Sequence, residues 1–182
     1  DFAIVTLLVN RLDDASAGPL IDALERATGR TTRAAVLRFL RDGGPGMREA
    51  AADRLPDAPW FLQRNLLQLF TDPADWPGGF SPAAYAKSPD GRVRREAIKV
   101  MLQSRAHRNE GLELGLRDSD ARVRGMTLSS AVEECPPLLI PLLHAVARDE
   151  KAEMDHRVLA IRALVSTGAS GAVGSFTGIA FP

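Results

Sequence analysis

Cysteine is almost absent from this sequence. Cys135 is the single cysteine in 182 residues, so the chain can form neither an intrachain disulfide nor a cluster of thiolate metal ligands. Reduced cysteine is typical of a reducing compartment, and we expect a cytoplasmic protein. No apolar run approaches the ~18 residues that a membrane span requires. The opening segment DFAIVTLLVN also lacks the basic start and small-residue cleavage site of a signal peptide.

An excess of charge of either sign is also absent. The sequence holds 23 Lys and Arg against 23 Asp and Glu, so no strong overall field gathers nucleic acid. Aromatic residues make up only 5% of the chain. Ala and Leu dominate the apolar residues, and this composition favours helices over strands.

What the sequence does contain is a repeat. The stretch PDGRVRREAIKVM begins at Pro89, and SDARVRGMTLSSA follows thirty residues later. In both, Asp precedes Val-Arg, and apolar residues then recur at offsets of three and four, which places one apolar stripe on a helix. Similar stripes recur every 30 to 33 residues, and they begin at Thr31, Leu62, Val93, Val123 and His156.

A second apolar position recurs between these stripes, at Leu24, Leu55, Ala86, Leu116 and Ala147. Each unit therefore reads as two helices joined by a turn that contains Asp, Gly or Pro. This pattern predicts an all-α fold, an α-solenoid of about five helix pairs in a superhelical stack over residues 1–166, with a partial first unit in 1–14. Stacking buries the apolar face that a single helix pair cannot cover.

The units resemble HEAT repeats, especially the short bacterial HEAT-like kind. The resemblance rests on Asp-x-x-Val-Arg at the start of the second helix, and it is strongest over residues 80–166. It implies a ladder of hydrogen-bonded ion pairs from repeat to repeat, formed by Asp90, Arg94, Asp120, Arg124, Asp155 and Arg157. Thr32 and Gln63 stand where Arg is expected, so we expect the ladder in the C-terminal half only.

Two stretches interrupt the period. Residues 71–81, TDPADWPGGFS, carry two prolines and two glycines where a first helix should begin. We interpret this stretch as a loop in which Trp76 is a packing plug, with a partner contact as the alternative. The glycine-rich, uncharged tail 167–182 is either a disordered end or a segment bound to a partner.

The sequence shows no recognisable catalytic or metal-binding pattern. His107, His144 and His156 all lack a histidine or cysteine three or four positions away, the local spacing of zinc ligands. Cys135 precedes two prolines at a helix break, and we expect a buried thiol there. We therefore expect no metal, no cofactor and no enzymatic activity.

The leading hypothesis is a non-enzymatic protein-binding or scaffold module, part of a larger protein or assembly. Its partner would bind to a concave surface lined by the second helices. The candidate partner-binding residues are basic side chains of that surface and the two tryptophans: Arg64, Arg92, Arg95, Arg122, Trp60 and Trp76.

Two other functions remain open. Basic residues outnumber acidic ones between Arg92 and Arg124, and some HEAT-like solenoids, including alkylpurine DNA glycosylases, grip DNA backbones. A solvated helix face is the favoured explanation of this excess. The third hypothesis is an enzyme-accessory domain similar to the HEAT-like chromophore lyases of phycobilisomes, to which only the repeat itself bears likeness.

Overall fold

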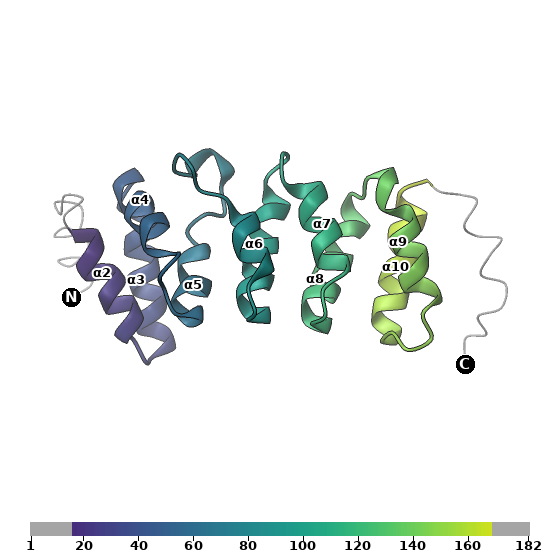
Figure 1. The fold of residues 1–182 in the computed structure, drawn as a ribbon, viewed down its shortest axis with the longest axis horizontal. Helices are drawn as coiled ribbons and strands as arrows, with labels where there is room; N and C mark the ends of the chain where they lie inside the picture. Colours follow the sequence, from purple (N-terminus) through teal and green to yellow (C-terminus); the bar gives the residue numbers. More distant parts are fainter. Residues whose placement is uncertain (1–15, 169–182) are drawn as a thin grey trace. The chain divides into compact units, whose positions relative to one another are not determined.

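A computed structural model describes residues 16–168, and every regular element in that range is a helix (Figure 1). The predicted all-α class is therefore confirmed for the described residues. The backbone divides between Gln103 and Ser104 into two compact units. None of the helices in this range is long and apolar enough to cross a bilayer.

The first unit holds three consecutive helix pairs, which the predicted pattern of two helices per repeat anticipated. The pairs are α2 (Ala17–Arg26) with α3 (Arg30–Asp42), α4 (Pro45–Arg54) with α5 (Trp60–Leu67), and η3 (Pro82–Lys87) with α6 (Gly91–Gln103). Helix α2 also packs against α4, and α5 packs against α6, so members of adjacent pairs lie side by side. The short η2 (Pro73–Asp75) lies in the loop between the second and third pairs.

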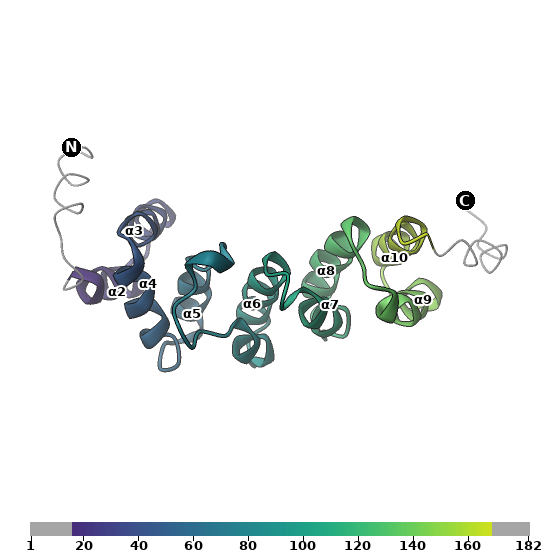
Figure 2. The same ribbon diagram turned by 90° about the horizontal axis from the view of Figure 1, so that it is seen from above.

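The second unit holds two further pairs. They are α7 (Arg108–Leu116) with α8 (Ala121–Glu133), and α9 (Ile140–Arg148) with α10 (Met154–Ser166), where the short η4 (Pro137–Leu139) precedes α9. Helix α10 packs on both α8 and α9. Figure 2 shows α8 and α10 in one layer and α7 and α9 in another.

Glycine allows the helices of the second unit to approach closely. A Cβ atom on Gly115 of α7 would lie 2.1 Å from Thr127 Oγ1 of α8, and one on Gly125 of α8 would lie 2.8 Å from His156 Nε2 of α10. Both positions therefore pack helix backbone directly against a neighbouring side chain. His156 and Thr127 are themselves buried.

The predicted apolar positions form the core. Five predicted positions, one in or directly after the first helix of each pair, are all at most 5% exposed: Leu24, Leu55, Ala86, Leu116 and Ala147. The stripes that begin at Leu62, Val93 and Val123 are fully buried throughout, and in the last pair only Ile161 is half-buried. The spacing thus predicted which residues of these helices are buried.

The stripe predicted for α3 was wrong by one residue. Thr31 is exposed, whereas Leu37 and Leu40 are buried. Aligning Arg33, rather than Thr32, with Arg94 places these two leucines on the positions of the buried Ile98 and Met101. Since nearly every residue from 34 to 40 is apolar, both registers produce an apolar stripe and the sequence pattern does not separate them.

The first helix of the third pair is a short 3-10 helix and not an α-helix. The segment PAAYAK forms the six-residue 3-10 helix η3, with Pro82 at its first position and Ser88-Pro89 directly after it. Because a proline opens the segment and another closes it, too few residues remain for the α-helical ladder to develop. Ala86 still reaches the core from this shortened helix.

Trp76 packs within the loop that joins the second and third pairs. Its Nε1 donates a 2.8 Å hydrogen bond to the carbonyl of Phe70, and its ring meets Phe80 edge to face at 5.5 Å. Phe80 in turn stacks on the fully buried Phe70, with ring centroids 4.0 Å apart. These contacts support the interpretation of Trp76 as a packing plug.

The two predicted terminal segments lie largely outside the described residues. This applies to the partial unit at 1–14 and to all but the start of the tail at 167–182. Gly168, the last described residue, has φ +67° and follows the end of α10. Glycine at a positive φ is a common way for a helix to end.

Candidate binding groove

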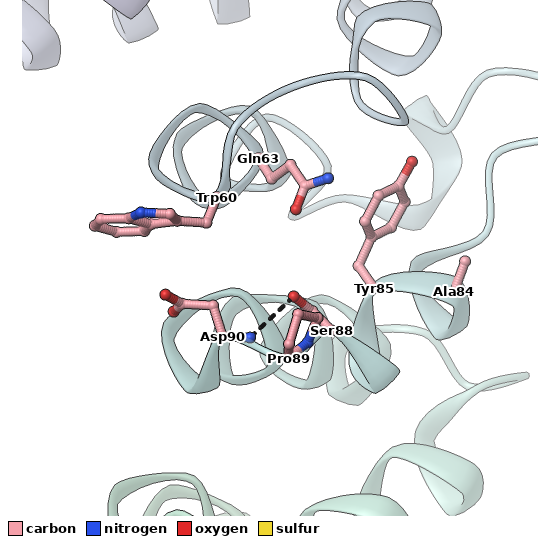
Figure 3. A pocket seen from close by; sticks show the side chains of 7 residues that line it. All are labelled: Trp60, Gln63, Ala84, Tyr85, Ser88, Pro89 and Asp90. Carbon is pink, nitrogen blue, oxygen red and sulfur yellow. Dashed lines mark hydrogen bonds between the residues drawn. The ribbon is translucent and has the colours of Figure 1, made fainter.

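A groove of about 640 Å³ opens in the first unit, between the start of α5 and the turn that joins η3 to α6 (Figure 3). Its volume is in the range of about 300–1,000 Å³ that ligand sites usually have. The lining residues are Trp60, Gln63, Ala84, Tyr85, Ser88, Pro89 and Asp90. Figure 3 shows Trp60 and Tyr85 on opposite sides of Gln63.

Trp60 is held in place although it lies at the surface. It is the first residue of α5, after the extended Pro59, and it is 39% exposed. The Arg92 guanidinium carbon lies 3.4 Å from the centroid of the indole ring, a cation–π contact, and Phe61 meets the ring edge to face at 5.7 Å. The groove thus presents an aromatic side chain whose position is set before any partner arrives.

Asp90 holds the Arg92 side chain in the position from which it contacts Trp60. Its Oδ1 accepts a 2.8 Å hydrogen bond from the Arg92 backbone N–H and so caps α6, and its two oxygens also accept 3.1 and 2.8 Å bonds from Arg92 Nε and Nη2. The side-chain bond from Arg92 is the main reason that the pKa of Asp90 is lowered to about 2. The Asp90–Arg92 pair is therefore fully ionised at neutral pH.

Replacing Asp90 with asparagine should destabilise the protein near pH 7 and have little effect near pH 2. Asparagine keeps the capping oxygen but loses the charge that pairs with Arg92. The pKa of Asp90 in the folded protein, about 2, is below its ordinary value of 3.8. The stabilisation is therefore present above about pH 4 and disappears as the pH falls from there toward 2.

Urea unfolding of both proteins at a series of pH values measures this difference. The gap between their free energies of unfolding should be constant above about pH 4 and close below it. A difference in the free energy of unfolding that persists unchanged to pH 2 would show that the ionic pair is not its source.

Two hydrogen-bond donors of the groove have no described partner. Within residues 16–168, no hydrogen bond is described for Trp60 Nε1 or Tyr85 Oη. Burial raises the pKa of Tyr85, so its hydroxyl stays protonated and can donate at neutral pH. Gln63 Nε2, by contrast, donates to the Leu55 carbonyl at 3.1 Å, and Ser88 Oγ accepts from Asp90 N–H at 3.3 Å.

The structure brings together only part of the predicted binding set. Trp60 and Arg92 meet at the groove. Arg95 is exposed on α6, and Arg64 is half-buried with its Nη2 bonded to Asn65 Oδ1 at 2.9 Å. Arg122 is exposed at the start of α8 in the second unit.

The sequence analysis missed Tyr85, and it did not predict that Asp90 would line a groove. Tyr85 is the single tyrosine of the chain, but it lies in a segment that reads as an ordinary first helix. Asp90 was assigned to the ladder alone. The available signal was that Trp60 begins α5 and Asp90 directly precedes α6, next to turns, where side chains are accessible to partners.

The arginines predicted to form the ladder bind backbone carbonyls of the turns. Arg94 Nη1 donates to the carbonyls of Ser88 and Pro89, and Arg124 Nη1 donates to those of Asp118 and Ser119, all at 2.8 to 3.1 Å. Arg33 makes the same pair of bonds, to Ala27 at 3.2 Å and Thr28 at 2.9 Å. In each case the acceptors lie six and five residues before the arginine, and we call this arrangement the arginine clamp.

The described contacts of the other ladder residues are also local. Asp120 Oδ1 accepts from Arg122 N–H at 2.8 Å and caps α8, as Asp90 caps α6. Arg157 Nε donates to the Ala147 carbonyl of α9 at 3.3 Å. Asp155 is exposed in the first turn of α10, where no bond to Arg157 is described. The continuous ladder between repeats stays a prediction.

Outside the groove, the candidates for chemistry are the buried thiol of Cys135 and any metal-ligand cluster among the described residues. Burial raises the pKa of the Cys135 thiol, and the nearby Arg108 offsets this only in part, so the thiol is mostly protonated at neutral pH. Residues 16–168 contain no group of three or more His, Cys, Asp or Glu side chains arranged to hold a metal ion.

Comparison with known protein families, with curated proteins and with solved structures finds no match to this chain.

Proposed function

We propose that this chain is a HEAT-like helical-repeat module that binds another protein through the groove at Trp60 and Tyr85 and catalyses no reaction itself. The observation that carries the proposal is the exposed indole of Trp60, which Arg92 holds in place at 3.4 Å. The module would act in the cytoplasm, as part of a larger protein or assembly.

The arginine clamp supports the repeat part of this proposal. Arg33, Arg94 and Arg124 each bind the two carbonyls at the same offsets, in three different helix pairs. A contact that recurs with the same geometry is what stacked copies of one structural unit should share. The packing of α2 on α4, of α5 on α6 and of α8 on α10 is consistent with such a stack.

The composition of the groove supports the binding part. Tryptophan, tyrosine and arginine are the residues that most often carry binding energy at protein interfaces. Trp60, Tyr85 and Arg92 lie at or beside the groove. Because Trp60 is already fixed by its neighbours, a partner would immobilise little additional side-chain freedom when it binds.

Arginines that are bonded within each unit weaken the alternative of nucleic-acid binding. Arg92 is paired with Asp90, and Arg94 and Arg124 donate to turn carbonyls. These three guanidinium groups are therefore used within the fold, and fewer remain to neutralise phosphates. Retention of labelled DNA or RNA that declines with salt would favour the alternative instead.

Selection from a displayed library of peptides taken from disordered protein segments tests the proposal. The full chain should enrich a related set of peptides, and Trp60→Ala should abolish their binding. Leu138→Ala is the matched control, since Leu138 is 82% exposed and lies outside the groove; this variant should bind as the unmodified chain does. Failure to enrich any peptide whose binding depends on Trp60 would contradict the proposal.

A further inference from the structure

The chemistry of the groove indicates which kind of segment it accepts. We propose that the groove binds an extended, proline-rich segment of a partner protein in the polyproline II conformation. This inference rests on the proposed function. Three features carry this inference: the aromatic walls, the two donors without a described partner, and the absence of an unpaired charge among the lining side chains.

The walls suit the side chains of proline. Trp60 and Tyr85 stand on either side of the groove, and Ala84 and Pro89 add further apolar surface (Figure 3). Rigid pyrrolidine rings pack well on aromatic faces, and a segment that is already extended loses little entropy on binding. Trp60 itself is fixed by Arg92, so this wall is in place before a partner binds.

The hydrogen-bonding groups suit the backbone of such a segment. Trp60 Nε1 and Tyr85 Oη can both donate, and both lie at the edge of the groove away from Ser88 and Pro89 (Figure 3). A polyproline II helix has no internal hydrogen bonds, so its carbonyls are free to accept. Proline has no N–H, so a proline-rich segment does not require acceptors from the groove.

The charges and the mixed lining argue against other occupants. The one lining carboxylate, Asp90, is neutralised by Arg92 at 2.8 Å, so neither a basic peptide nor a nucleic acid finds an unpaired opposite charge among the lining residues. Gln63, Ser88 and Asp90 interrupt the apolar surface. An amphipathic helix prefers a continuous apolar groove, and this one is not continuous.

Titration of the full chain with a fluorescently labelled ten-residue polyproline peptide tests the inference, with a Gly-Ser peptide of equal length as the probe control. Fluorescence anisotropy should show saturable binding of polyproline and none of the Gly-Ser peptide. Trp60→Ala should weaken binding about ten-fold or more, as loss of a central aromatic contact does. Tyr85→Phe, which removes only the hydroxyl, should weaken it by about five-fold, equivalent to one hydrogen bond.

Leu138→Ala serves as the matched protein control here as well, because Leu138 is 82% exposed and does not line the groove. Its affinity for polyproline should equal that of the unmodified chain, and circular dichroism should show all variants folded. Absence of saturable binding to the folded chain, or binding that survives Trp60→Ala, overturns the inference. If the displayed library instead yields helical or basic peptides that depend on Trp60, protein binding is upheld and the polyproline assignment fails.

Discussion

Replacing Phe70 with alanine is expected to lower the free energy of unfolding of the first unit by about 3–5 kcal/mol, the usual cost of removing a buried aromatic ring. Phe70 is fully buried, and its ring stacks on Phe80 at 4.0 Å. Phe80 also packs against Trp76, which donates to the Phe70 carbonyl. The variant therefore leaves a cavity and also removes the surface on which the 71–81 loop rests.

The intrinsic fluorescence of the protein reports on this change. Both tryptophans and the single tyrosine belong to the first unit, so urea unfolding followed by tryptophan emission measures that unit. Phe70→Leu retains much of the buried volume and should lose clearly less stability than Phe70→Ala. Val165→Ala, at a residue that is 62% exposed on α10, should change the transition by less than about 0.5 kcal/mol. A loss below about 1 kcal/mol for Phe70→Ala would contradict the described packing.

Gly115→Ala is expected to destabilise the second unit by about 1–3 kcal/mol, although alanine is the better helix former. The new Cβ atom would lie 2.1, 2.8 and 2.9 Å from three side-chain atoms of Thr127. Rotation of Thr127 cannot relieve the contact with its own Cβ, and its Oγ1 is bonded to the Val123 carbonyl at 2.9 Å. Helices α7 and α8 must therefore move apart.

Gly18→Ala is the matched control for this prediction. Gly18 also lies in a helix, but a Cβ atom there would meet no atom of residues 16–168 within 4 Å. The same substitution should stabilise the protein there by a few tenths to about 1 kcal/mol. Thermal unfolding followed by circular dichroism should thus show shifts of opposite sign for the two variants; shifts of the same sign would contradict the close approach.

Thr127→Ala provides a second check on the cause. It removes two of the three atoms that the new Cβ would meet. The combined Gly115→Ala and Thr127→Ala protein should therefore lose less stability than the sum of the two single variants. Strictly additive losses of stability would show that the contact with Thr127 is not the cause of the Gly115→Ala effect.

The helical class and most of the buried positions were predictable because burial leaves a periodic trace in the sequence. Leu116 and Val123 recur with the period of their repeats, and both are buried in the structure. The shift of one residue in α3 was not predictable, since an almost wholly apolar run fits two registers equally well. Only Arg33, which binds the turn carbonyls as Arg94 does, reveals the correct alignment.

The groove was less predictable, because it depends on contacts between residues that no local pattern connects. Trp60 and Arg92 were both candidate binding residues, but their separation of 32 positions gave no reason to expect a contact of 3.4 Å. Tyr85 belongs to a segment whose conformation is decided by its two flanking prolines. A site built where helix ends meet requires the packing of those ends, and hydrophobic periodicity describes helix faces only.

The arginine clamp places no requirement on the side chains of its two acceptor residues, because the acceptors are carbonyl oxygens that every residue supplies. The three clamped turns share no residue type at either acceptor position: they hold Ala27 and Thr28, Ser88 and Pro89, and Asp118 and Ser119. These two acceptor positions can consequently accumulate substitutions during evolution, or be changed in the laboratory, while the arginine continues to bind their carbonyls. New specificities can thus arise at the ends of the helices without any rebuilding of the interior.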